Sequence, residues 1–107
     1  MVNIYTLSDP RTNEVRYIGK TVSSLKDRHG RHLTDIKTPN ISIRLNWIRG
    51  LVKEGLKPII ELVDVVSDET WAEEESFYIS YFRYLGMSLT NMTDGGEGTN
   101  RYFTEEH

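Results

Sequence analysis

Apolar and polar positions follow regular patterns in six stretches of the chain, and each stretch predicts one secondary-structure element. Two short stretches rich in β-branched and aromatic residues predict strands, and the Asp9-Pro10 turn signal between them predicts a hairpin. Three longer stretches have helical periodicity, and an apolar run before the last of them predicts a strand more buried than the hairpin. The expected strands are 2–7, 14–19 and 59–66, and the expected helices are 25–37, 41–54 and 69–85.

The order of these elements predicts the fold class. The order β-β-α-α-β-α is typical of an α+β fold, here a small, mainly antiparallel three-stranded sheet flanked by about three helices. Ser24 and Asp27 have capping-box spacing at the start of the first helix, and Asp68 is the expected cap of the third. The second helix carries an apolar stripe that should face the core, formed by Ile41, Leu45, Ile48 and Val52.

The hairpin brings two tyrosines together. A turn centred on Arg11 places Tyr5 opposite Tyr17 on one face of the sheet, with Cβ atoms about 5 Å apart. Such a pair can simply pack the sheet, or it can hold two phenol groups ready for chemistry. A register slip of one residue would move the two rings to opposite faces.

The third helix directs one carboxylate toward the core. Glu75 lies in the middle of the apolar arc of this helix, whereas Glu73 and Glu74 lie on its flanks or outside it. An unpaired buried carboxylate is costly, so Glu75 should have a cation, a cage of hydrogen bonds or a bound proton. Periodicity leaves two interpretations open: an ion pair with an arginine, or a metal ligand or acid–base group in a cleft.

The first helix is basic. Arg28 and His32 lie four residues apart, so they share a face, and they border the apolar stripe where a cleft-lining residue would lie. The alternative is a solvated helix face with an Arg31–Asp35 pair.

Composition and charge narrow the function further. The chain has 107 residues, enough for one domain, and its lack of Cys excludes a disulfide scaffold, a thiolate zinc site and a cysteine nucleophile. Residues 1–60 hold 11 Lys and Arg against 5 Asp and Glu, whereas residues 61–107 hold 2 against 11. The basic half indicates an anionic partner such as nucleic acid, unless the two halves only attract each other. Without a long apolar run or a leader-like start, we expect a cytoplasmic protein with no membrane partner.

Short motifs carry the two tyrosines and the other candidate residues. In chain order they are Asn3-Ile4-Tyr5, Tyr17-Ile18-Gly19 followed by Lys20, Arg28 with His32, Glu75-Ser76-Phe77-Tyr78-Ile79, and Leu89-Thr90-Asn91. This ordered set resembles the GIY-YIG nuclease family over residues 2–98, and it is similar to the compact stand-alone members common in phages and bacteria. The sequence departs from the family pattern at Asn3, where the first motif has Gly, and at Asn40, where homing-type relatives have His.

The resemblance implies hydrolysis of a DNA phosphodiester bond with one divalent metal ion, Mg²⁺ or Mn²⁺, held by Glu75. Arg28 would stabilise charge on the phosphoryl oxygens, which its planar fork fits. Tyr5 would be the general base for the attacking water. Tyr17 would hold the water or the phosphate, or act as the base instead.

The resemblance also implies which other residues serve the site. The catalytic set would be Tyr5, Tyr17, Arg28, His32, Glu75 and Asn91, and the DNA-binding set Lys20, Arg31 and Asn40. Asn91 would bind the phosphate or steady Glu75. A tyrosine has a reference pKa of about 10, so a tyrosine base needs a neighbouring cation to lower its pKa. Lys20, His32 or the metal ion could supply that charge.

The expected organisation is a nuclease-like domain at 1–98 and a C-terminal tail at 99–107. DNA is the expected partner, with a homodimer or an accessory specificity protein left open. The alternative function is a catalytically inactive module on the same scaffold, which binds nucleic acid or another protein. A metal-ligating glutamate favours the enzyme, because a binding module has no need of an inward carboxylate.

Overall fold

The computed structural model describes residues 1–92 and confirms the α+β fold and the expected order of elements. The sheet is antiparallel throughout, in the order β2-β1-β3. Residues 93–107 lie outside the described part, and with them the expected tail and the end of the expected domain. The elements are β1 (Val2–Ser8), β2 (Val15–Thr21), α1 (Leu25–Asp35), α2 (Ile43–Lys53), β3 (Ile59–Val66) and α3 (Trp71–Tyr84).

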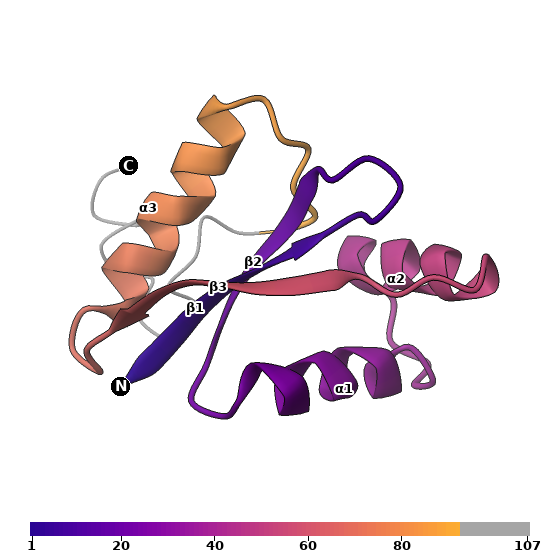
Figure 1. Cartoon of the computed structure of the whole chain (residues 1–107), viewed down its shortest axis with the longest axis horizontal. Coiled ribbons are helices and arrows are strands. Elements are labelled where there is room, and N and C mark those ends of the chain that lie inside the picture. The colour runs from indigo at the N-terminus through magenta and orange to yellow at the C-terminus, as the bar shows by residue number, and fades with distance from the viewer. Residues whose placement is uncertain (93–107) are drawn as a thin grey trace.

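Helices cover both faces of the sheet. Because successive side chains of a strand point to opposite faces, the central strand β1 contributes side chains to two apolar clusters, one on each face. α3 lies on one side of the strands, and α1 and α2 lie on the other (Figure 1). The cluster under α3 contains Val2, Ile4, Ile18, Val66 and Ile79, and the cluster under α1 and α2 contains Tyr5, Leu7, Trp47, Ile48 and Leu51.

The expectation that the third strand is the most buried is wrong. β3 is an edge strand, and Leu62 in its middle is 51% exposed. In contrast, residues 4–9, which comprise most of the central strand β1 and the residue that follows it, are all buried. An apolar run therefore did not distinguish an edge strand from a central one. β3 also carries a register shift opposite Ile4 and Tyr5, which interrupts the alternation of its side chains.

Two helix starts differ from expectation. α2 begins after Ser42, whose hydroxyl accepts a hydrogen bond from the Leu45 backbone N–H at 3.0 Å. Ile41 therefore precedes the helix and is 84% exposed instead of facing the core, and Val52 is also exposed. α3 begins after Thr70 and not after Asp68, and no side chain caps it. The Ser24 cap of α1 is confirmed.

Asp9 fastens the hairpin turn to α2. Its carboxylate accepts hydrogen bonds from the backbone N–H and guanidinium of Arg11 at 2.8–2.9 Å. It also accepts one from the indole N–H of Trp47 at 3.1 Å. The hydrogen bonds from Arg11 hold the pKa of Asp9 well below its usual range, even though burial opposes them. This buried acceptor therefore joins the end of β1, the turn and α2.

Removing the Asp9 carboxylate should destabilise the fold. Asp9→Ala leaves the buried Trp47 N–H without an acceptor, and we expect it to lower the free energy of unfolding by about 3 kcal/mol. Glu54→Ala is the matched control, because Glu54 pairs with the same Arg11 at 2.8 Å on the surface and should cost no more than about 1 kcal/mol. Urea unfolding measures both variants, and equal losses would contradict this account of the turn.

Candidate active site

The hairpin register differs from the expected one by two residues. Tyr5 pairs with Gly19, and Tyr17 pairs with Leu7. The turn is longer than expected because Asn13 adopts a positive φ of 61° and the register shifts between Leu7 and Ser8. A shift of two residues keeps both tyrosines on the same face, since side chains alternate with a period of two. Their ring centroids lie 6.2 Å apart.

The hydroxyl of Tyr5 is the centre of a buried hydrogen-bond network. It lies 2.7 Å from Nε2 of His32, and it accepts a hydrogen bond from Nε of Arg28 at 3.0 Å. Arg28 and His32 stand one turn apart on α1, so a single helix face supplies both partners. Tyr5 and His32 are both fully buried. The structure therefore brings together three of the residues that the sequence predicted.

The network leaves one nitrogen of His32 without a partner. Arg28 must donate its N–H, so the proton of the Tyr5 hydroxyl is free to go to Nε2 of His32 when that nitrogen is unprotonated. The buried Nδ1 then carries the imidazole hydrogen and meets no acceptor within residues 1–92. In the other tautomer Nε2 donates to Tyr5, and Nδ1 is an unused acceptor. Either way, the imidazole is held mainly by its bond to Tyr5.

Burial controls the charge of both partners. Burial, helped by the positive charges of Arg28 and Arg44, lowers the pKa of His32 to about 3. His32 is therefore a neutral imidazole at neutral pH and does not supply the cation expected from the sequence. Burial also raises the pKa of Tyr5, and Arg28 only partly opposes it. The protein groups alone thus keep the Tyr5 hydroxyl protonated, which differs from the lowered pKa expected of a base.

Tyr17 is half-buried and has a partner that the sequence did not indicate. The guanidinium carbon of Arg44, on α2, lies 5.2 Å from the centroid of the Tyr17 ring. Nη1 of Arg44 donates to the Tyr17 hydroxyl at 3.3 Å. The His32 ring packs edge-on against Tyr17 at 5.6 Å. One local signal existed: Arg44 is a cation in the first turn of a helix that has no acid there, where the helix dipole disfavours positive charge.

Gly19 makes room for the tyrosine pair. A Cβ atom at this position would lie 2.5 Å from Cζ and the hydroxyl oxygen of Tyr5 and 2.7 Å from Cε2 of Tyr17. No ordinary carbon contact is this short, so a side chain here would displace one or both rings. The glycine two residues after Tyr17 is therefore required by the close approach of the Tyr5 ring to the backbone of β2.

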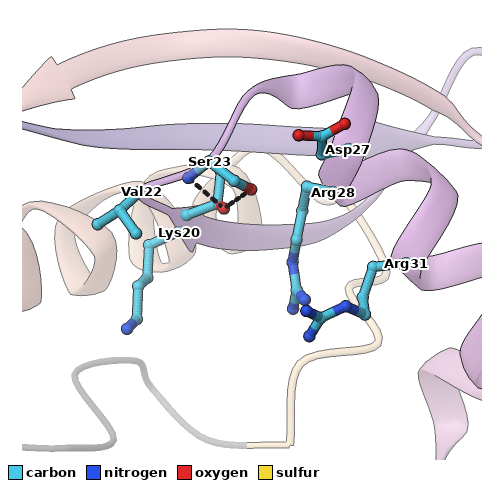
Figure 2. A pocket seen from close by; sticks show the side chains of 7 residues that line it. Lys20, Val22, Ser23, Asp27, Arg28 and Arg31 are labelled. Atoms are coloured by element: carbon cyan, nitrogen blue, oxygen red, sulfur yellow. Dashed lines mark hydrogen bonds between the residues drawn. The ribbon is translucent and has the colours of Figure 1, made fainter.

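A basic cleft opens beside the network. It has a volume of about 620 Å³ and lies between the end of β2, the loop that follows and the start of α1. Figure 2 shows the side chains of Lys20, Arg28 and Arg31 directed to the same side of the ribbon. None of the three forms an ion pair with a carboxylate in the part of the chain that the structure describes. The Arg31–Asp35 pair of the alternative interpretation is thus not formed. Three cations and one carboxylate, that of Asp27, line the cleft, so its net charge is positive.

The remaining predicted residues lie at different places. Glu75 is buried as expected, 8% exposed, but it belongs to α3 and so to the opposite face of the sheet from the tyrosines. Lys20 reaches toward that face too, with its amine 4.4 Å from the ring centroid of Trp71. The side-chain amide of Asn91 forms two hydrogen bonds with the backbone of Ile18: its oxygen accepts at 3.0 Å and its nitrogen donates at 2.8 Å. Asn40 is exposed between α1 and α2 and does not line the basic cleft.

The structure shows no ready-made metal cluster around Glu75 among the described residues. No group of three or more His, Cys, Asp or Glu side chains that could hold a metal ion is found among residues 1–92. Mg²⁺ commonly takes one or two protein carboxylates and completes its shell with water and substrate phosphate. Glu75 therefore fits Mg²⁺ or Mn²⁺ only as part of a site that the substrate completes.

Comparisons with known proteins add no family to this description. No family model matches the chain, and no curated protein or solved structure is similar enough to count as a match. Within the described residues, no helix has the length and apolar character needed to cross a membrane. The functional interpretation consequently depends on the geometry of the side chains themselves.

Adding a methyl group at Gly19 should disrupt the site. Gly19→Ala forces the Tyr5 ring away from β2, and such overpacking typically costs about 1–3 kcal/mol of the free energy of unfolding. Gly30→Ala is the control: nothing lies within 4 Å of a Cβ there, and alanine in a helix should stabilise the protein by up to about 1 kcal/mol. Thermal unfolding measures both. A Gly19→Ala protein as stable as the wild type would contradict the close approach.

The buried His32 should make stability depend on pH. Its folded pKa of about 3 lies below the unfolded value of about 6.5, so the unfolded chain binds a proton first as pH falls. The free energy of unfolding should therefore fall by up to about 1.4 kcal/mol per pH unit below pH ~6.5, and the stabilisation is fully present only above it. Urea unfolding between pH 7.5 and 5 measures this slope. A His32 imidazole that titrates near pH 6.5 by NMR would refute the prediction.

Proposed function

We propose that this chain is a metal-dependent endonuclease that hydrolyses DNA phosphodiester bonds. The observation that carries the proposal is the contact of Arg28 with the buried Tyr5–His32 pair at the wall of a cleft lined by three cations and the carboxylate of Asp27. An electropositive cleft attracts a phosphate backbone, and tyrosine, arginine and imidazole beside it are groups suited to phosphoryl chemistry. The ordered motifs that resemble GIY-YIG nucleases point the same way.

Arg28 would bind the phosphate that is cleaved. Its Nε is committed to Tyr5, which fixes the plane of the guanidinium, and within residues 1–92 neither terminal nitrogen has a hydrogen-bond partner. Those nitrogens form a fork that matches two phosphoryl oxygens, and they stabilise the negative charge that grows there during attack. Tyr5 and His32 thus orient Arg28 through one hydrogen-bonded chain.

Tyr17 is the more accessible of the two tyrosines, and neither is among the residues that line the basic cleft. Tyr5 is fully buried with both sides of its hydroxyl occupied, whereas Tyr17 is only half-buried. Tyr17 would hold the attacking water and accept its hydrogen bond. The neutral His32 is an acceptor for the Tyr5 proton, so the Tyr5–His32 pair can adjust its protonation as charge changes nearby.

Glu75 would hold the metal ion at the open edge of β2. The tyrosines lie on one face of the sheet and Glu75 on the other, and β2 is the edge strand next to both. Thr90 and Asn91 cover this edge at Arg16 and Ile18, and within residues 1–92 no further segment bonds to it from Gly19 onward. When bound, a divalent ion would polarise the phosphate and neutralise the leaving oxygen.

One observation favours the second candidate function, an inactive nucleic-acid-binding module. Among the described residues no group of three or more metal-ligating side chains is found, and a module that only binds DNA needs no metal ion at all. The two functions predict different responses to metal. Binding through the cleft would persist in EDTA, whereas hydrolysis would stop.

The test is the nicking of supercoiled plasmid by the purified chain. We expect nicking in Mg²⁺ or Mn²⁺, none in EDTA, and a loss of at least about 100-fold for Glu75→Gln, which keeps the shape of the side chain but removes its charge. Glu73→Gln is the matched control, because Glu73 is exposed on the same helix and should leave the rate unchanged.

Two results would overturn the nuclease function. Nicking that survives Glu75→Gln in a preparation free of other nucleases would remove the metal role of this residue. A wild-type chain that shifts DNA in a gel, with or without EDTA, yet never nicks it would support the binding module instead.

A further inference from the structure

Arg44 is an arginine without an ordinary structural role. It is partly buried, and it forms no ion pair with a carboxylate within residues 1–92. Its Nε is buried and has no hydrogen-bond partner among these residues. A buried donor without an acceptor is unfavourable, and a cation at a helix start adds a smaller penalty. These unfavourable features indicate that the residue is kept for something other than stability.

Within residues 1–92, the side-chain hydrogen bond and the cation–π contact of Arg44 are both with Tyr17. Its guanidinium carbon lies 5.2 Å from the ring centroid, which is within the range of a cation–π interaction. Its Nη1 donates to the hydroxyl oxygen at 3.3 Å. The first contact restrains the ring, and the second occupies one lone pair of the oxygen. The proton and the other lone pair of the Tyr17 hydroxyl then point in a fixed direction.

The other neighbours of Tyr17 do not duplicate this contact. They are Tyr5 from β1 and Arg28 and His32 from α1. Arg28 gives its Nε to Tyr5, and His32 is neutral because burial lowers its pKa to about 3. Arg44 is therefore the cation that forms a hydrogen bond with the Tyr17 hydroxyl. Its charge also reaches the rest of the cluster, where it opposes the rise in the pKa of Tyr5.

We propose that Arg44 is a positioning residue that aims the Tyr17 hydroxyl at the attacking water. This role rests on the proposed nuclease function, and it acts through Tyr17 and not through the DNA. The residues that line the cleft include Lys20, Arg28 and Arg31 but neither Arg44 nor Tyr17, so Arg44 would not contact DNA bound there directly. Loss of Arg44 should consequently slow the chemical step and leave DNA affinity unchanged.

Single-turnover nicking and DNA binding separate these two effects. For Arg44→Ala we expect the rate to fall about 10- to 100-fold, because a misplaced group commonly costs up to that much. The dissociation constant for a duplex in EDTA should stay within twofold of the wild type. Added methylguanidinium should restore part of the lost rate, and Arg44→Lys should restore little, since an ammonium lacks the planar fork. Lys53→Ala, which removes an exposed cation from the same helix, is the control.

Three results would overturn the role of Arg44: an unchanged rate, a loss of affinity that matches the loss of rate, or no rescue by methylguanidinium. Ring-flip rates of Tyr17 by NMR provide a readout that does not need activity. They should rise in Arg44→Ala, and rates equal to those of the wild type would show that Arg44 does not hold the ring. If the wild-type chain never nicks DNA, the proposed function fails, and the ring-flip rates still decide whether Arg44 restrains Tyr17.

Discussion

The hydroxyl of Tyr5 is the atom on which the arrangement of the site depends. It joins the central strand to α1 through His32 at 2.7 Å and Arg28 at 3.0 Å. Without it, Nε2 of His32 and Nε of Arg28 would have no hydrogen-bond partner within residues 1–92. Gly19 is the condition for this contact, because any larger residue would collide with the Tyr5 ring. The structural constraint is therefore the absence of a side chain at Gly19 on β2. The groups that bond to Tyr5 come from α1, and Arg28 also faces the cleft.

The electrostatics of the site follow from that burial. A neutral imidazole and a protonated phenol form the inner layer, while Lys20, Arg28 and Arg31, none of which forms an ion pair within residues 1–92, form the outer layer at the cleft. Such an arrangement concentrates positive potential at the edge of β2. Glu75 lies on α3, on the other face of the sheet, and is not among the residues that line this cleft.

Much of this could be predicted from the sequence, and the failures have physical causes. Hydrophobic periodicity gave the order of the elements and the inward direction of Glu75, because helices must bury their apolar side. The hairpin register was wrong because a left-handed Asn13 and a bulge near Ser8 depend on tertiary fit. Arg44 was missed because its partner Tyr17 is distant in sequence, and Asn40 was assigned by resemblance to a cleft it does not line.

The most direct test of the central claim is a single round of cleavage in ¹⁸O-labelled water. A duplex is incubated with excess protein and Mg²⁺, and the new ends and the protein are analysed by mass spectrometry. Attack by water held at Tyr17 predicts one ¹⁸O atom in the terminal phosphate and no DNA attached to the protein. A DNA–tyrosine adduct, or a duplex that is bound and never cleaved, would contradict the account.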